Sequence, residues 1–389
     1  MIIQLLAEKS FSAPTSARVK KIEELQQRIY ELEKKQNEFD DWYNNFYVLG
    51  KSRLVPFLGH KISLGGYFET GIINIYGKDT ENQLSAYSHD LGINLSAEFS
   101  EQVRFVTQTL TIVNIPFQNP HNNPQLTPNR REYLGLVYGS LVAQGYVEFS
   151  ASDFFKIQSG IGYAPFGIAH QQREPFLFHA RGGPQFINPD GYDIAPIVAL
   201  WMGLHVSGLL PLSKSTAGYN LYSFTPGSNV KTLGIGGRLW WAPNEFVTTG
   251  ISVQYGDREA GSFLSQGFDI DIKYKNFGFI SEYGLVNSSG NAGDLEAYYI
   301  EPYYKFNENK WLVYLSAEYL HEPGRRDAVT RLLDPFEKKF FGGGVNWLPI
   351  SNAKLRLGYL KHIYLHEPDN IGAPEKDYDA VEFSAAIAY

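Results

Sequence analysis

The feature that most constrains this chain is the period-two alternation of apolar and polar residues that runs from about residue 60 to the end. In "LGINLSAEF" the odd positions from Leu91 to Phe99 are apolar or small, while Asn94, Ser96 and Glu98 are polar. Alternation of this kind predicts strands with one apolar and one polar face. Bounded by Gly, Asn, Asp, Ser and Pro clusters, about sixteen strands are predicted, at 61–76, 89–99, 103–113, 134–149, 154–163, 196–210, 217–225, 230–241, 246–255, 264–274, 277–286, 295–306, 311–320, 337–348, 355–364 and 378–389.

The connections between these strands fall into two kinds. Those after the even-numbered strands are short, such as "KN" at 275–276 and "NENK" at 307–310. Those after the odd-numbered strands tend to be longer, at 77–88, 114–133, 164–195, 321–336 and 365–377. An even-stranded antiparallel meander with short turns at one end and long loops at the other is typical of a transmembrane β-barrel. A β-sandwich has no reason to separate its loops in this way.

Aromatic residues stand on both sides of most short turns. They are Phe149, Phe154, Phe155, Trp240, Trp241, Phe246, Tyr274, Phe277, Phe306, Trp311, Trp347 and the terminal Tyr389. Aromatic rings prefer the membrane interface, so a row of them at one rim predicts an aromatic girdle. A general preference of strand ends for aromatic residues explains one or two such turns, but not five.

Composition excludes several classes of protein. The 389 residues include no Cys, which rules out a disulfide framework and thiolate chemistry. The formal net charge is −7 with both signs scattered along the chain, so the basic field that nucleic-acid binding needs is missing. No run of 18 apolar residues offers a helical membrane span. The opening "MIIQLLA" lacks a positive n-region, and residues 1–17 are interpreted as disordered or as the remnant of a signal.

Residues 18–49 differ from the rest, because their apolar positions step by three and four. This heptad seam predicts an α-helical coiled coil that pairs with identical helices. Ile and Leu at the two seam positions favour two strands on the general rule, whereas "RIYELE" is similar to a pattern known from three-stranded coiled coils, and we expect a trimer. An amphipathic helix folded onto its own domain is the alternative. The predicted oligomerisation residues are Ile22, Leu25, Arg28, Ile29, Leu32 and Glu33.

Alternation also predicts which side chains face the interior of the barrel. In "LVAQGYVEF", for example, Leu141, Ala143, Val147 and Phe149 are expected to face lipid. A charge on the lipid face at mid-bilayer costs about 2–4 kcal/mol, so charged residues within strands are assigned to the interior. Those charged positions are Arg104, Lys156, Arg238, Asp269, Asp271, Lys273, Glu282, Arg356 and Glu382, joined by Glu98 and Glu148.

The longest connection, 164–195, is rich in Pro, Gly and aromatic residues and is expected to pack inside the barrel. An extracellular surface loop is the alternative. Its charged residues would line a constriction that selects solutes. The loop contains no HExxH and no His pair at i, i+4, so neither a metal nor a cofactor is predicted. The predicted constriction and pore-lining residues are His170, Arg173, Glu174, His179, Arg181, Arg104, Glu98, Glu148, Arg238 and Arg356.

Together, the turn pattern, the long loop after the fifth strand, the heptad segment and the aromatic-ended strand "VEFSAAIAY" resemble the bacterial trimeric porins of the 16-stranded family. A coiled coil before the barrel is similar to some phosphate-selective relatives, but the inferred interior is mixed and slightly acidic, so that substrate is not carried over. The resemblance implies an all-β, 16-stranded antiparallel transmembrane β-barrel (60–389) in the outer membrane, with the coiled coil in the periplasm. It also implies that loop 164–195 folds inward and that 114–131 latches onto a neighbouring subunit.

The same resemblance implies a set of partners. These are two further copies in a homotrimer, outer-membrane lipid and lipopolysaccharide, the barrel-assembly machinery and, as an additional candidate, peptidoglycan. Phe383 and Tyr389 would form the membrane-insertion signal. No nucleic acid is expected.

The sequence leaves four candidate functions. The first is a passive pore for small hydrophilic solutes and ions. The second is a structural protein that tethers the membrane to the cell wall through its coiled coil. An outer-membrane hydrolase is the third, but the chain has no GxSxG elbow, and an enzyme is not predicted. The fourth, a soluble lectin-like β protein, does not explain the aromatic residues paired at the turns.

Overall fold

A computed structural model of the protein describes residues 55–57, 60–77, 80–115, 137–168, 200–212, 215–225, 233–258, 261–289, 294–322, 336–366 and 377–389. The predicted signal remnant (1–17), the coiled coil (18–49) and nearly all of the proposed latch (114–131) lie outside these residues. The strands are β1 Val55–Phe57, β2 His60–Gly77, β3 Thr80–Glu98, β4 Val103–Ile115, β5 Val137–Ser152, β6 Phe155–Tyr163, β7 Leu200–Leu212, β8 Ser215–Phe224, β9 Gly234–Asn244, β10 Val247–Arg258, β11 Gly261–Tyr274, β12 Phe277–Ser288, β13 Leu295–Phe306, β14 Trp311–Glu322, β15 Phe336–Ile350, β16 Ala353–His366 and β17 Tyr378–Ala388.

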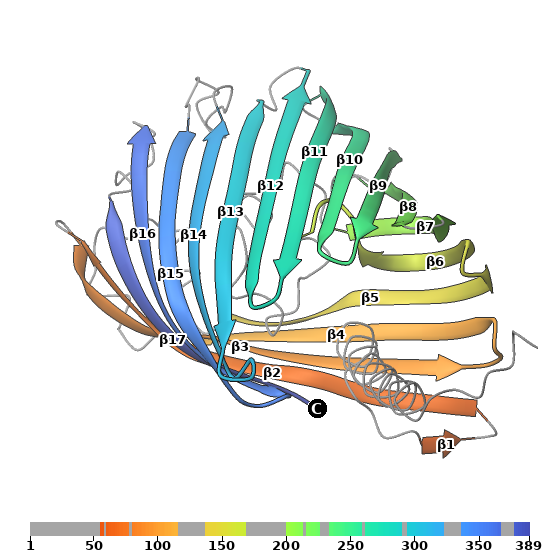
Figure 1. The fold of residues 1–389 in the computed structure, drawn as a ribbon, viewed down its shortest axis with the longest axis horizontal. Coiled ribbons are helices and arrows are strands. Elements are labelled where there is room, and N and C mark those ends of the chain that lie inside the picture. The colour runs from red at the N-terminus through yellow and green to blue at the C-terminus, as the bar shows by residue number, and fades with distance from the viewer. Residues whose placement is uncertain are drawn as a thin grey trace, which may run out of the picture. The chain divides into compact units, whose positions relative to one another are not determined.

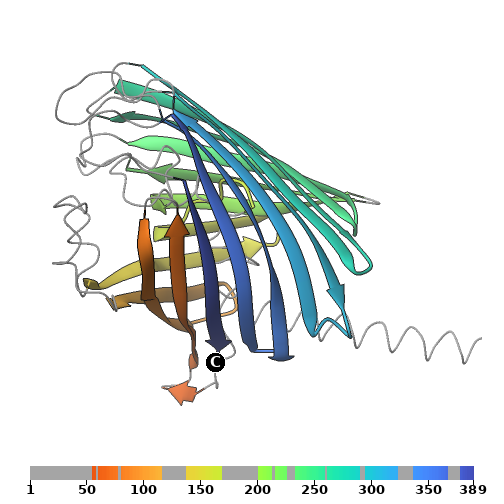
Figure 2. The same ribbon diagram turned by 90° about the vertical axis from the view of Figure 1, so that its left-hand side faces the viewer.

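Strands β2 to β17 form one closed antiparallel barrel of 16 strands. Figure 1 shows their arrangement. Each strand pairs with the next in sequence, and the ring closes where β17 pairs with β2 from Asp379↔Tyr76 to Ala388↔Tyr67. Figure 2 shows these two strands side by side. The short β1 pairs with the start of β2. The predicted all-β barrel and its strand count are therefore confirmed.

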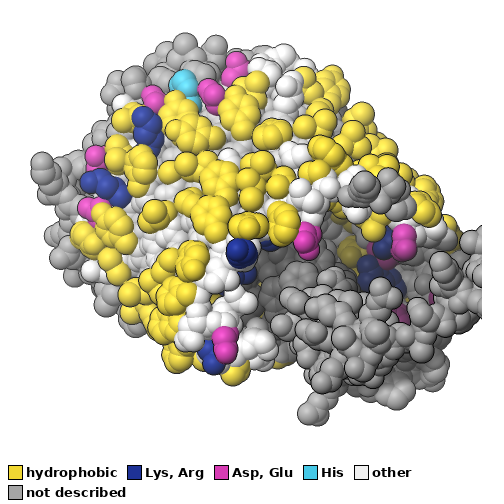
Figure 3. Space-filling view, in the orientation of Figure 1, with side chains coloured by type: hydrophobic (Ala, Val, Ile, Leu, Met, Phe, Trp, Pro, Cys, Tyr) yellow, Lys and Arg dark blue, Asp and Glu magenta, His cyan; other side chains and the backbone are white. Residues whose placement is uncertain are grey.

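The two faces of the barrel wall differ as the alternation predicts. On β3, Ile93 is 42% exposed on the outer face, whereas Asn94 on the inner face is 4% exposed. Hydrophobic side chains predominate on the outer face that Figure 3 shows. Among the described residues, no helix combines the length and the apolar character needed to cross a membrane.

One face assignment on β5 was wrong. Leu141 and Ala143 were expected to face outward, but Val142 is the exposed residue, at 53%. The cause is a register shift, because Gln108 pairs with Gln144 while Thr109 pairs with Val142. The extra residue is a β-bulge, which reverses the face of every residue beyond it.

The first long connection was also predicted incorrectly. Residues 77–88 were expected to form a loop, but β3 already begins at Thr80, and Gly77 pairs with Thr80. The paired strands of the β2–β3 hairpin therefore extend well beyond the residues whose apolar alternation predicted them.

Aromatic side chains ring the outer face at the end of the barrel that carries the short turns, here called the short-turn end. Phe306 stacks on Trp311 with ring centroids 6.3 Å apart, and Trp311 stacks on Trp347 at 5.8 Å. Phe246 packs edge-on against Tyr274 at 5.5 Å. The described structure thus contains the predicted row of aromatic residues along the short turns, except that Trp240 shares the inner face with Arg238 while its neighbour Trp241 faces outward.

The terminal residue belongs to this row. Tyr389 and Gly66 exchange two backbone hydrogen bonds, each 2.9 Å long. A Cβ atom at Gly66 would lie 2.9 Å from the Tyr389 hydroxyl oxygen, so the ring covers this glycine. The chain therefore ends paired at the seam where the barrel closes.

Candidate functional site, the inner wall of the barrel

The inner wall carries the polar and charged side chains that the outer face lacks. Burial on this face follows the side-chain alternation of each strand. The buried ionisable residues on it are Glu69, Glu148, His205, Arg238, Asp269, Glu282, Glu301, Glu318, Lys338, Lys354, Arg356, His362 and Glu382.

Arg238 on β9 and Asp269 on β11 form a bidentate ion pair across β10. Arg238 Nε donates to Asp269 Oδ2 at 3.1 Å, and Nη2 donates to Oδ1 at 2.6 Å. The strand between them presents Gly250 there, where a Cβ atom would lie 2.6 Å from Asp269 Oδ2. The absence of a side chain at Gly250 therefore allows Arg238 and Asp269 to meet across β10.

A second ion pair crosses the closure seam. Arg356 on β16 donates through Nη1 to Glu69 Oε1 on β2. Between them, β17 presents the small Ser384, which pairs with Arg356 in register. This contact links residues 287 positions apart in sequence and ties together the two ends of the barrel sheet.

A continuous chain of polar side chains crosses five neighbouring strands, β4 to β8. Arg104 Nη2 donates to Glu148 Oε2 at 3.1 Å, and Gln158 Nε2 donates to the same oxygen at 2.6 Å. The His205 ring lies between Gln158 and Asn220, with Nδ1 2.7 Å from Gln158 Oε1 and Nε2 3.0 Å from Asn220 Oδ1. Because the carboxylate of Glu148 accepts only, it orients the Gln158 amide and assigns a hydrogen to Nδ1 of His205.

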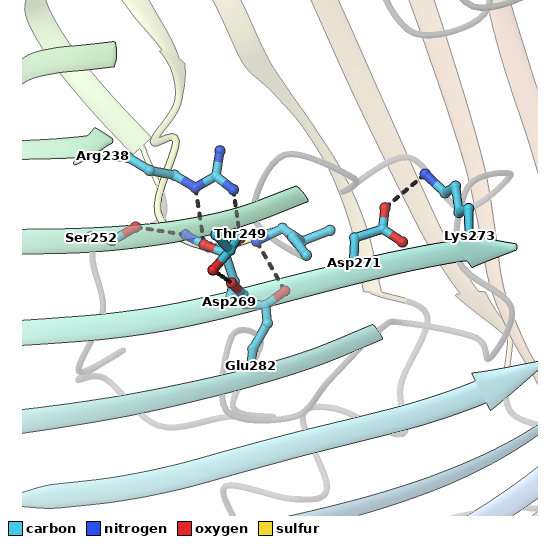
Figure 4. A network of polar contacts seen from close by, with 9 residues as sticks. Arg238, Thr249, Ser252, Asp269, Asp271, Lys273 and Glu282 are labelled. Carbon is cyan, nitrogen blue, oxygen red and sulfur yellow. Dashed lines mark hydrogen bonds and ion pairs between the residues drawn. The ribbon is translucent and has the colours of Figure 1, made fainter. Parts of the chain in front are cut away.

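The long loop begins by packing against another part of this wall, the inner face of β10–β12. Phe166 is buried and lies over Gly267 of β11. The backbone N–H of Gly167 donates to Ser252 Oγ on β10 at 3.1 Å, and that of Ile168 donates to Glu282 Oε1 on β12 at 3.0 Å. Figure 4 shows these contacts beside the Arg238–Asp269 pair. Residues 164–168 therefore dock on the inner face of β10–β12 directly after β6 ends at Tyr163.

Carboxylates cluster around Tyr299 on β13. Its hydroxyl donates to Glu301 Oε2, and its cross-strand neighbours on the same face are Glu282 and Glu318. All three carboxylates are buried. Within the described ranges, no group of three or more His, Cys, Asp and Glu side chains is placed to hold a metal ion.

The predicted site residues divide into two groups. Glu98, Arg104, Glu148, Arg238 and Arg356 all lie on the inner face. Arg104 pairs there with Glu148, Arg238 with Asp269 and Arg356 with Glu69. The loop residues His170, Arg173, Glu174, His179 and Arg181 lie outside the described residues. So do the oligomerisation residues Ile22, Leu25, Arg28, Ile29, Leu32 and Glu33.

Several inner-wall residues were not singled out from the sequence. Glu69, Gln158, His205, Asn220, Glu301 and Glu318 all fall within predicted strands. The rule that assigns charged strand residues to the interior applies to the three glutamates, and counting by two from Lys156 reaches Gln158. Lys354 was placed in a turn, but β16 starts at Ala353.

No protein-family model matches the sequence, and no curated protein sequence matches it either. Solved structures do resemble it. OmpT of Vibrio cholerae, an outer membrane protein in trimer form, is 12% identical with a TM-score of 0.54, over 85% of this chain and 99% of that one. An anion-selective porin from Comamonas acidovorans is 11% identical with a TM-score of 0.55, over 85% of this chain and 100% of that one.

The outer membrane channel DcaP of Acinetobacter baumannii is 10% identical with a TM-score of 0.55, over 88% of this chain and 100% of that one. At these identities the likeness concerns the fold. The protein has the closed 16-stranded antiparallel barrel of the outer-membrane porins.

Proposed function

We propose that the protein is an outer-membrane porin, a water-filled channel for passive diffusion of small hydrophilic solutes and ions. The observation that carries the proposal is the closed 16-stranded barrel with a polar inner and an apolar outer face. A barrel of this strand number is wide enough for an aqueous channel. A soluble β protein would instead need a polar outer face. No catalytic residue takes part.

The bacterial outer membrane is the proposed location. The apolar outer face and the aromatic row at the short-turn end fit a hydrocarbon layer and its interface. Lipid and lipopolysaccharide are then the partners of the outer face. Phe383 and Tyr389 on the closing strand are the proposed insertion signal for the barrel-assembly machinery.

Loop 164–195 is the proposed constriction. Supporting this role, residues 164–168 dock on the inner face of β10–β12 rather than leave the barrel. The charged side chains that follow, from His170 to Arg181, would then filter solutes by charge.

A homotrimer is the proposed assembly, held in the periplasm by the coiled coil of residues 18–49. The heptad seam supports this, and the similar OmpT structure is described as a trimer form. The same seam favours a second candidate function, a tether that joins the membrane to peptidoglycan. Tether and pore are compatible in one molecule.

Conductance across a planar lipid bilayer tests the pore directly. The purified full-length protein should produce current steps in groups of three, as expected for three pores that insert together. The same protein, unfolded before addition, is the control and should produce none. If the folded protein gives no current, the porin proposal is wrong.

A further inference from the structure

Five strands carry a cationic side chain at the same place on the inner wall. Each is second from the short-turn end of its strand, and they are Arg104 of β4, Lys156 of β6, Lys273 of β11, Lys305 of β13 and Lys354 of β16. Arg356 follows two residues further in. Within five residues of the same end, the described inner wall carries three carboxylates, Glu98, Glu148 and Asp271. Cations thus outnumber carboxylates here, and this zone is called the basic rim.

The next zone inward has the opposite sign. Six carboxylates lie between the sixth and tenth residue from the short-turn end of their strands: Asp269, Glu282, Glu301, Glu318, Glu382 and Glu69. Arg238 is the only cationic side chain on the described wall at the same depth. This zone is called the acidic belt.

Neighbouring charges within and between these zones interact. Lys305 interacts electrostatically with Lys273, and Lys354 with both Lys305 and Glu301. Burial in a low-dielectric wall makes such charges act over longer distances than they do in water. The zones therefore act as groups rather than as isolated side chains.

The distance between the basic rim and the acidic belt determines the salt concentration at which their electric fields act on ions in the lumen. Four residues along a strand, from second to sixth position, span roughly 13 Å, or about 10 Å along the axis of a tilted barrel. The Debye length is about 3 Å at 1 M salt and about 30 Å at 0.01 M. The two fields should therefore fill the lumen at low salt and be screened at high salt.

We propose that the lumen is electrically polarised along its axis and that the pore rectifies ion current, an inference that rests on the proposed porin function. The acidic belt admits cations and the basic rim admits anions. When the chamber at the long-loop end is positive, cations enter through the belt while anions enter through the rim, and both accumulate where the zones meet. With the opposite voltage each ion meets the zone that repels it, so the lumen is depleted. Current should be larger when the long-loop chamber is positive.

Single-pore current of the purified full-length protein at equal positive and negative voltages tests this. In about 1 M KCl the two currents should be equal, because the charges are screened. In about 0.02 M KCl they should differ by about twofold or more. Because the chain has no Cys, a bulky maleimide added to one chamber of an Asn276→Cys protein reports which chamber the short turns face.

Variants of the basic rim show whether unequal currents arise from the charges of the wall or from the shape of the pore. Lys156→Gln with Lys273→Gln should move the low-salt current ratio toward one, because it removes two of the three excess positive charges of the rim. Lys275→Gln is the matched control, since Lys275 lies in the β11–β12 turn over the outward Tyr274 ring and should leave the ratio unchanged. Lys156→Glu with Lys273→Glu should also shift the reversal potential in a salt gradient toward cations.

The outcomes separate two failures. Equal currents at low salt in a conducting pore would overturn the axial charge order and leave the porin proposal intact. Larger current with the long-loop chamber negative, or a rim variant that behaves like Lys275→Gln, would overturn it as well. No current at all would refute the pore itself and the inference with it.

Discussion

The ion pair across the closure seam gives a prediction whose size follows from the structure. Arg356 and Glu69 are 1% and 3% exposed, and removing one partner of a buried pair costs about 3–5 kcal/mol because the other charge stays buried. Lys354 also interacts electrostatically with Glu69 and offsets part of this cost. We therefore expect Arg356→Met to lower the free energy of unfolding by about 3 kcal/mol, roughly a hundredfold in the equilibrium constant.

Urea unfolding of the barrel refolded into lipid vesicles measures this, followed by the fluorescence of the six Trp residues. A loss of about 3 kcal/mol should lower the midpoint by about 1 M. The double variant Arg356→Met, Glu69→Leu should recover most of the loss, since an apolar replacement of both partners leaves no buried charge.

The pair within the wall provides a matched control for location. Arg238→Met should destabilise to a similar extent, because its pair with Asp269 is equally buried and also spans one strand. Amide hydrogen exchange should distinguish the two variants, with faster exchange in β17 and β2 for Arg356→Met and in β9–β11 for Arg238→Met. If the double seam variant is as unstable as the single one, or if exchange rises equally everywhere, the seam charges are not what holds the closure.

Further predictions concern the terminus, the wall, the loop and the coiled coil. Deleting Tyr389 should reduce the yield of membrane-inserted protein, measured by fractionation, while Tyr389→Phe should not, because it keeps the ring and the backbone bonds to Gly66; equal yields would argue against an insertion role. Gly250→Val should cost about 1–3 kcal/mol in urea unfolding, since its side chain collides with the Arg238–Asp269 pair. Arg173→Glu with Arg181→Glu should change the anion-to-cation permeability ratio, and an unchanged reversal potential would mean that loop 164–195 is not the filter. Deleting residues 18–46 should abolish trimers or envelope attachment in cross-linking and sedimentation, and the survival of both would remove the coiled coil from either role.

The strands were predictable because two independent signals coincide. A barrel wall between lipid and water imposes strict alternation, and its short turns mark one end of each strand. For the last strand, the predicted 378–389 agrees with the observed Tyr378–Ala388. Where one of these signals is missing, prediction fails: residues 80–88, "TENQLSAYS", belong to β3 but show no apolar alternation, so their sequence predicts a loop.

Face assignments fail for a different reason, as β5 shows. Leu141, Val142 and Ala143 are all apolar, so nothing in the sequence marks which of them is the extra residue of the bulge. The bulge follows from the pairing of β5 with β4, which is a property of two strands. Ion pairs that span a strand are hidden in the same way, since the Arg238–Asp269 contact depends on the register of β9, β10 and β11 together.

Strand ends matter most for the charge on the wall. Lys354 was assigned to a turn because the last strand but one was predicted to start at residue 355, whereas β16 starts at Ala353. This difference of two residues places Lys354 at the second position of β16 on the inner wall instead of in a solvent-exposed turn. Four other strands carry a cation at the same position. Because side chains alternate with a period of two, an error of one residue in the alignment of a strand assigns a lumen-facing side chain to the lipid face. An error of two residues in a strand end assigns a side chain of the barrel wall to a turn. The polarity of the lumen as a whole therefore follows from the sequence, but the order of its charges along the axis requires the strand ends that the structure supplies.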